Sequence, residues 1–193
     1  MWQPRGERGI RVAVSLLACL LGLMMGIALV SGLRGPARAG TSPSESTRVR
    51  VGPGDVVINE VAWMGTEASA SDEWIELYNV TSVTMSLEGW HLVDDDHLDI
   101  LLTGHIPPQG TYLIERTDDD AVRDVSADWT GSFGLGGLSN AGEVLTLTDA
   151  LSNVVDVANG SGGEWPAGAA SEGTVPYATM ERIDPAAPDR EDN

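Results

Sequence analysis

The feature that most constrains the fold is a series of short runs, beginning at residue 56, in which apolar and polar residues alternate. Two of these runs stand close together, at residues 56–63 and 73–79, and a polar connection rich in small residues joins them. A period of two indicates a half-buried β-strand, and the β-branched and aromatic residues of both runs suit a pleated surface. We therefore expect two adjacent strands on which the later segments pack.

Strand-like runs continue at short intervals toward the C-terminus. The expected later strands are residues 85–87, 90–93, 100–102, 111–115, 143–148, 154–157 and 179–183. Turn-forming residues separate them, for example at 107–110 and 139–142, and no window after residue 40 keeps a helical period for three turns. Many short strands with turns between them predict an all-β antiparallel sandwich or barrel.

Strict alternation also predicts which side chains share a face. In the first run, one face is expected to hold Val57, Asn59, Val61 and Trp63, and the other Val56, Ile58, Glu60 and Ala62. In residues 73–79, Ile75 and Leu77 oppose Trp74, Glu76 and Tyr78, and in residues 143–148, Leu145 and Leu147 are expected to face the core.

The first 39 residues have the layout of a secretory signal. Arg5, Arg8 and Arg11 precede an apolar run at residues 12–30, and residues 37–39, Ala-Arg-Ala, offer a cleavage site. The run is close to the length of about 20 residues that spans a bilayer, so an uncleaved anchor with its N-terminus inside is the alternative. Either way the rest of the chain is expected to be extracytoplasmic, either secreted or membrane-anchored through residues 12–30.

The remaining boundaries follow from composition. Residues 40–54 are rich in Ser, Thr, Gly and Pro and predict a flexible linker, residues 55–184 form the β domain, and residues 185–193 are a disordered or truncated tail. The single cysteine, Cys19, lies in the apolar run, so the exported part has no disulfide, zinc–thiolate site or cysteine nucleophile. An exported domain without disulfides suits a bacterium better than an animal.

The charged residues of the chain limit the classes of partner and chemistry that we expect. The formal net charge is −18, which repels phosphate backbones and argues against nucleic-acid binding. All eleven basic residues are arginine, so P-loop and Schiff-base chemistry, which need lysine, are excluded. The expected partner is an extracellular protein or a cell-envelope component, and membrane contact is expected only through an uncleaved N-terminal segment.

Two acidic loops are candidate Ca²⁺ sites. One holds Asp94, Asp95, Asp96 and Asp99 with His97 among them, and the other holds Asp118, Asp119 and Asp120 with Asp124 and Asp128. Crowded carboxylates suit a hard cation that takes six to eight oxygen ligands. Neither loop has the EF-hand spacing, and the alternative is a solvated acidic loop on an acidic protein. No other cofactor is expected.

The chain gives little indication of catalysis. It has neither an HExxH nor a GxSxG motif. Glu60 and Glu76 lie on adjacent expected strands and could pair for acid–base work, but a structural role in the strands is the better interpretation. Among the tryptophans, Trp74 and Trp90 suit the core, whereas Trp165, in a Gly-rich segment, is the candidate for an exposed binding contact.

An ordered set of motifs resembles a known family. IELYN at 75–79, GWHL at 89–92, IPPQG at 106–110, DW at 128–129 and NAGEVL at 140–145 follow one another, with INEV at 58–61 and MER at 180–182 at the ends. The set resembles the lamin-tail domain in its bacterial secreted form, over roughly residues 56–183. The resemblance implies an immunoglobulin-like antiparallel β-sandwich with a binding or tethering role and no catalytic residues.

Two alternatives remain for the role of such a domain. Bacterial members of the family often accompany exported nucleases or other hydrolases, so an accessory domain whose catalytic part lies elsewhere is one alternative. A truncated chain would fit it, because similar proteins often continue past the last strand. The other alternative is a Ca²⁺-stabilised adhesion domain that uses the aspartate loops.

Overall fold

The structure, a computed structural model, describes residues 1–6, 50–171 and 176–187, and these residues form strands and loops without a helix. The strands are β1 (Trp2–Gly6), β2 (Val56–Ala62), β3 (Trp74–Asn79), β4 (Met85–Ser86), β5 (His91–Val93), β6 (Asp99–Leu101), β7 (His105–Ile106), β8 (Thr111–Arg116), β9 (Trp129–Gly131), β10 (Leu145–Thr148), β11 (Val154–Ala158) and β12 (Ala178–Arg182). The all-β expectation is confirmed.

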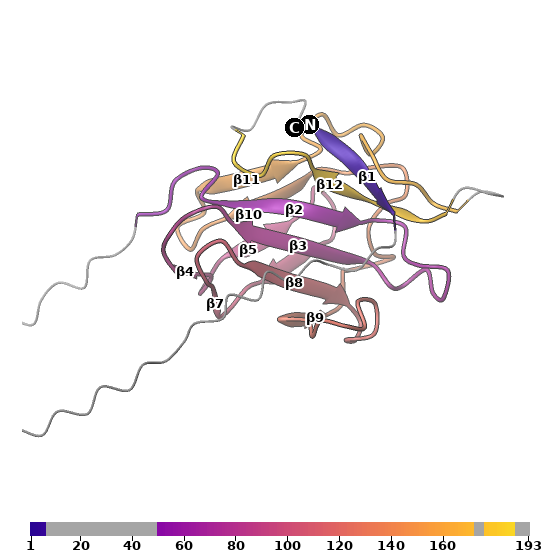
Figure 1. The fold of residues 1–193 in the computed structure, drawn as a ribbon, viewed down its shortest axis with the longest axis horizontal. Helices are drawn as coiled ribbons and strands as arrows, with labels where there is room; N and C mark the ends of the chain where they lie inside the picture. The colour runs from indigo at the N-terminus through magenta and orange to yellow at the C-terminus, as the bar shows by residue number, and fades with distance from the viewer. Residues whose placement is uncertain (7–49, 172–175, 188–193) are drawn as a thin grey trace, which may run out of the picture. The chain divides into compact units, whose positions relative to one another are not determined.

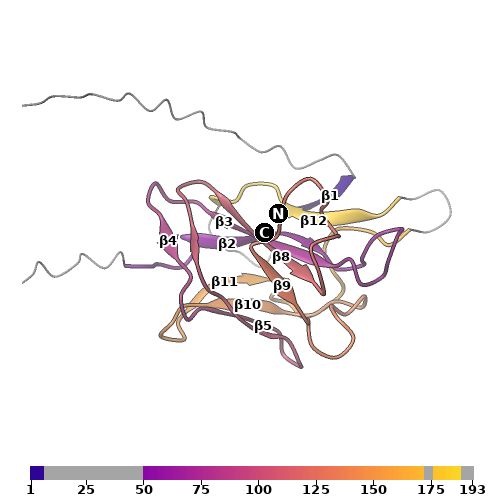
Figure 2. The same ribbon diagram turned by 90° about the horizontal axis from the view of Figure 1, so that it is seen from below.

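Two sheets make up the domain. The larger has the strand order β1-β12-β2-β3-β8-β9 and the smaller has the order β11-β10-β5-β6, while β4 and β7 form a short separate pair. Figure 1 shows the larger sheet in front of β5, β10 and β11, and Figure 2 shows the same strands as two layers seen from below. All strand pairs are antiparallel except β8 with β9, which is parallel.

A single large core fills the space between the two sheets. It takes Ile75 and Leu77 from β3, Leu145 and Leu147 from β10, and Phe133 from the loop after β9. The exposed fraction of each of these side chains is 0%, and burying one apolar side chain of this size contributes about 1.5–3 kcal/mol to stability. The faces expected for residues 73–79 and 143–148 are therefore confirmed.

The expected face pattern is wrong in β2. The pairing of β2 with β3 shifts register between Ile58 and Glu60, as in a β-bulge at Asn59. An extra residue in one strand interrupts the alternation, so side chains beyond it exchange faces. The core consequently receives Val56 and Ile58 before the bulge, but Val61 after it.

The nine expected strands are present, with ends that differ by one or two residues. The short β7 and the parallel β9 were not expected. Nor was β1, which lies inside the segment interpreted as a signal and pairs with β12 over five residues. The apolar run at 12–30, residues 40–49 of the linker and residues 188–193 of the tail lie outside the described residues. Within the described residues, no helix has the length and apolar character needed to cross a membrane.

Candidate functional site

A buried ion pair joins the two sheets. Nη2 of Arg182, on β12, donates to both carboxylate oxygens of Asp156, on β11, at 2.8 Å, and each side chain is 1% exposed. Arg182 Nε donates to the carbonyl of Ile58 at 3.0 Å, and the Ile58 amide donates to Asp156 Oδ2 at 2.7 Å. Hydrogen bonds between charged groups are stronger than neutral ones, so β2, β11 and β12 are held at one point.

Asn79, at the end of β3, holds the neighbouring loops in place through side-chain hydrogen bonds. Its side chain is fully buried and its Nδ2 donates to three carbonyls, those of Val83 at 2.7 Å, Pro107 at 2.9 Å and Ile106 at 3.2 Å. Its Oδ1 accepts from the amide of Thr81 at 2.9 Å. The last residue of the IELYN motif therefore fixes the connections on both sides of the β4–β7 pair.

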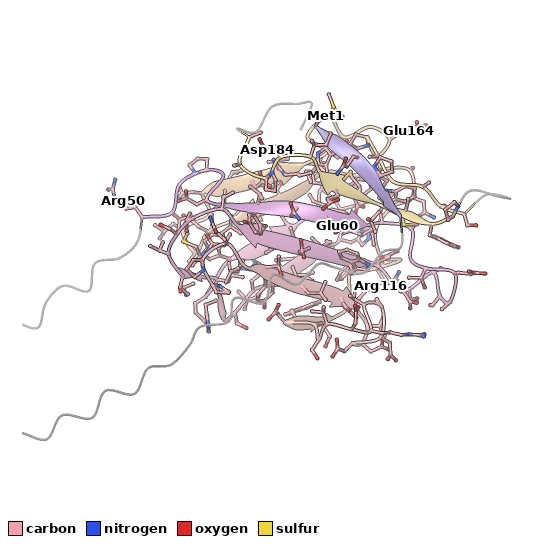
Figure 3. All side chains as sticks on the ribbon, in the orientation of Figure 1. Met1, Arg50, Glu60, Arg116, Glu164 and Asp184 are labelled. Atoms are coloured by element: carbon pink, nitrogen blue, oxygen red, sulfur yellow. The ribbon has the colours of Figure 1, made fainter. Side chains whose placement is uncertain are left out.

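Glu60 and Glu76 lie directly opposite each other on β2 and β3, as expected, and their exposed fractions are 2% and 5%. Figure 3 shows Glu60 on the face of β2 that the view presents to the reader. Glu60 accepts from the Thr179 hydroxyl, and Glu76 Oε1 accepts from Asn59 Nδ2 at 2.8 Å. These bonds tie the two carboxylates to neighbouring strands, which favours the structural interpretation.

Glu73 and Arg116 form a second partly buried ion pair, with Arg116 Nη1 at 3.1 Å from Glu73 Oε1. The other oxygen of Glu73 accepts from the Leu138 amide at 2.8 Å. Burial raises the pKa of Glu73 above its ordinary value, against the effects of this amide and of Arg116. Gly137 has a φ of 80°, and a Cβ there would lie 2.1 Å from Arg116 Nη1, so the loop needs glycine at this position.

In the first acidic loop, the aspartates differ in their partners and in their exposure. Asp94 Oδ1 accepts from the amides of Asp96, His97 and Leu98 at 2.7–2.9 Å, and these bonds outweigh burial and lower the pKa of Asp94. Asp99 instead contacts the His91 ring at 2.5 Å. Asp95 and Asp96 are exposed. Asp94 therefore closes the turn between β5 and β6.

The second acidic loop covers the outer face of the larger sheet. Its apolar residues pack on a small second cluster made of Ala62, Trp74 and Leu113. Asp118, Asp119 and Asp120 are all exposed, and Asp119 Oδ1 accepts from the Ala127 amide at 2.7 Å. In the part of the chain that the structure describes, no group of three or more His, Cys, Asp or Glu side chains is placed to hold a metal ion. The expected Ca²⁺ ligands are therefore not gathered into one site there.

Comparison with models of protein families identifies the family to which this β-sandwich belongs. The model of the lamin tail domain family matches residues 51–161, which is more than half of the chain. The chain belongs to the lamin tail domain family. No curated protein matches the sequence.

The family match runs from before β2 to just beyond β11 of this lamin tail domain. It includes Asp156 but ends before β12, which carries Arg182. In the structure β12 lies between β1 and β2 and supplies the buried Met180 to the core. The sandwich of this chain is thus completed by a strand outside the matched region.

Trp165 does not have the exposure expected of it. Its ring is 9% exposed and stacks on Trp63, with the ring centroids 6.3 Å apart and the planes 9° from parallel. Its Nε1 donates to the carbonyl of Ser139 at 2.7 Å. The prediction of an exposed contact was wrong, because the segment after β11 folds back and the ring joins the main core cluster.

The most consequential residue that the sequence reasoning missed is Asp156. It stands alone among Val154, Val155, Val157 and Ala158. A buried charge needs a partner, and a single acid inside an apolar strand is the signal that could have prompted a search for one.

Proposed function

We propose that this lamin tail domain is a non-enzymatic binding or tethering module that acts outside the cytoplasm. The observation that carries the proposal is that the partly and fully buried charged groups of the domain form hydrogen bonds within the fold. Asp156, Arg182, Glu73 and Asp94 each hydrogen-bond to strands or turns and thereby support the fold. A sandwich braced in this way offers rigid surfaces, which suit the recognition of another molecule.

The extracytoplasmic part of the proposal is supported by the N-terminal sequence. Arginines, an apolar run at 12–30 and the Ala-Arg-Ala at 37–39 form the layout of a secretory signal or anchor. The acidic composition supports a protein partner over a nucleic acid. Neither the hydrolase-accessory nor the Ca²⁺-adhesion alternative has a specific observation in its favour among the described residues.

In-cell crosslinking of the full chain tests this proposal. A tagged copy is produced in the organism that encodes it, crosslinked, and separated into cytoplasmic, envelope and extracellular fractions. The expected result is saturable adducts with envelope or extracellular proteins, unchanged in an Asp95→Asn/Asp118→Asn variant, because these two exposed aspartates of the acidic loops are assigned no role in binding. Adducts confined to cytoplasmic proteins, or adducts that disappear with the double variant while its melting temperature is unchanged, would contradict it.

A further inference from the structure

The outer edge of β12 is the surface through which we propose that this domain binds another protein. The bound segment is inferred to be an extended peptide that carries an aromatic side chain and basic side chains, and that adds to the sheet as a strand. This inference rests on the proposed binding function and assigns it a surface and a class of partner.

The strand β1 shows how such a peptide would bind. It runs antiparallel to β12 from Trp2 opposite Arg182 to Gly6 opposite Ala178, and the Ile183 amide donates to the Met1 carbonyl at 2.8 Å. Figure 1 shows β1 beside β12 at the margin of the sheet. In strand addition of this kind, main-chain hydrogen bonds give affinity and pockets for alternate side chains give specificity.

An aromatic side chain has a defined place at this edge. The ring of Trp2 is 8% exposed, belongs to the main core cluster and lies 5.3 Å from Cζ of Arg182. A desolvated guanidinium against an aromatic face is a favourable cation–π contact. Arg182, itself fixed by Asp156, therefore forms the floor of a position that selects an aromatic residue.

The fit of β1 is incomplete. Nε1 of Trp2 and Nη1 of Arg182 are both buried and have no hydrogen-bond partner. A buried donor left without an acceptor costs about 1–3 kcal/mol, so β1 binds more weakly than a strand that supplies an acceptor here. This edge is therefore suited to exchange one strand for another.

The position of β1 in the sequence explains why another strand would replace it at the edge of β12. Residues 2–6 precede the apolar run at 12–30. Cleavage of a signal after Ala39 removes β1, and insertion of the run as an anchor places β1 on the opposite side of the membrane from β12. In both cases the exported domain has an open sheet edge, and an open edge is a template for pairing with another chain.

The charge around the edge favours a basic peptide. Glu181 on β12 lies opposite Glu60, and Glu60 lies opposite Glu76, so acidic residues cross three neighbouring strands. Glu181 also accepts a 3.5 Å hydrogen bond from Gln3 of β1. On a chain with a net charge of −18, electrostatic complementarity speeds the approach of a basic partner and disfavours acidic ones.

Peptide binding to the full chain tests the inference. The probe is a fluorescent peptide with the sequence of residues 1–8, Met-Trp-Gln-Pro-Arg-Gly-Glu-Arg, followed by anisotropy. In the wild-type chain β1 competes at an effective concentration on the order of millimolar, whereas Trp2→Ala weakens this competition. We expect the Trp2→Ala chain to bind the peptide at least about tenfold more tightly than the wild-type chain does.

Two altered peptides serve as controls and need no change in the protein. Replacing the tryptophan of the peptide with alanine should weaken binding about tenfold or more, because the contact with Arg182 is lost. A scrambled peptide of equal charge should not bind.

A matched pair of protein variants tests the main-chain pairing. Glu181→Pro in the Trp2→Ala chain should abolish binding while Glu181→Ala preserves it, since proline removes an amide on the β1 side of β12.

Three outcomes would overturn the inference. The first is no peptide binding to a folded Trp2→Ala chain in which amide exchange shows that the β12 edge is open. The second is equal binding of the scrambled peptide, which would mean attraction to the acidic surface alone. The third is a wild-type dimer that exchanges β1, which would make a second copy the partner. Because this assay needs no export, its failure is distinguishable from failure of the proposed location.

Discussion

Asp156 lies between Val155 and Val157 on β11. The alternation of apolar and polar residues does not indicate which group pairs with its buried carboxylate. The structure supplies the answer from the opposite sheet, with Arg182 and the Ile58 amide as its partners. At this scale, pairing across the sheets is set by tertiary packing, because the two residues are 26 positions apart and belong to different sheets. The sequence could therefore predict that charges lie near the strands, but not which ones meet.

Removing one member of this pair tests its role. Asp156→Ala leaves the Arg182 guanidinium buried without its counter-charge, so we expect the free energy of unfolding to fall by about 3–5 kcal/mol. Urea unfolding of the full chain measures the change. The double variant Asp156→Leu/Arg182→Met should recover only part of the loss, because it removes the unpaired charge but also the partners of the buried Ile58 amide and carbonyl. Asp95→Ala, at an exposed position, should change stability by no more than about 0.5 kcal/mol. Equal effects of Asp156→Ala and Asp95→Ala would argue against a supporting role for the pair.

Asn79 gives a second prediction at the residue scale. Asn79→Ala removes the donor to the Val83, Ile106 and Pro107 carbonyls, and we expect a loss of about 2 kcal/mol because some of these groups stay buried without a partner. The control is Asn153→Ala, because Asn153 is exposed and its side chain bonds only to Asp149 in its own turn. Urea unfolding should rank the two variants in this order, and the reverse order would contradict the bracing role.

At the scale of elements, the sequence located strands better than it located their partners. Alternation is local, so the nine runs that show it were found. The short strands β7 and β9, of two and three residues, were missed, and with them the pairs β4–β7 and β8–β9. The bulge at Asn59 in β2 was missed for a different reason, since it depends on how β2 pairs with β3. Trp165 was misjudged because its Gly-rich surroundings resemble an exposed loop, whereas the loop folds back over Trp63.

The glycine loop between β9 and β10 allows a matched test. Gly136 and Gly137 both have positive φ, of 100° and 80°, but only a Cβ at Gly137 meets other atoms, those of Arg116 and Glu73. Gly136→Ala should therefore cost about 1–2 kcal/mol from backbone strain alone. Gly137→Ala should cost more, because it also separates the ion pair. Thermal unfolding of both variants measures the difference, and equal melting temperatures would contradict close packing at Gly137.

At the scale of the whole molecule, the carboxyl groups predict how stability depends on pH. Burial raises the pKa of Glu73, Glu115, Glu143 and Asp128. A group with a raised folded pKa contributes stability that is complete below its unfolded pKa and is lost as the pH rises through its folded pKa. The pKa of Asp94 is lowered in the folded state, so its contribution is present above its unfolded pKa and is lost as the pH falls through its folded value.

We therefore expect the free energy of unfolding to increase when the pH is lowered from 7 toward 4.5, the unfolded value for glutamate, and to decrease below 3.8, the value for aspartate. Urea midpoints of dilute protein between pH 7 and pH 3 measure this. Glu143→Gln removes one of the raised groups and should reduce the gain above pH 4.5. A midpoint that falls steadily from pH 7 downward would show that the lowered carboxyls dominate instead.

Protease accessibility in intact cells tests whether this domain lies outside the cytoplasm. Intact cells of the organism that encodes the chain, spheroplasted where an outer membrane is present, are treated with protease, and residues 50–187 are followed with an antibody. We expect the domain to be digested or found outside the cells while a cytoplasmic marker stays protected. Its N-terminus should then be Gly40, or the apolar run should remain in the membrane fraction. A domain protected together with the cytoplasmic marker would contradict an extracytoplasmic binding module, and would leave β1 on the edge of β12.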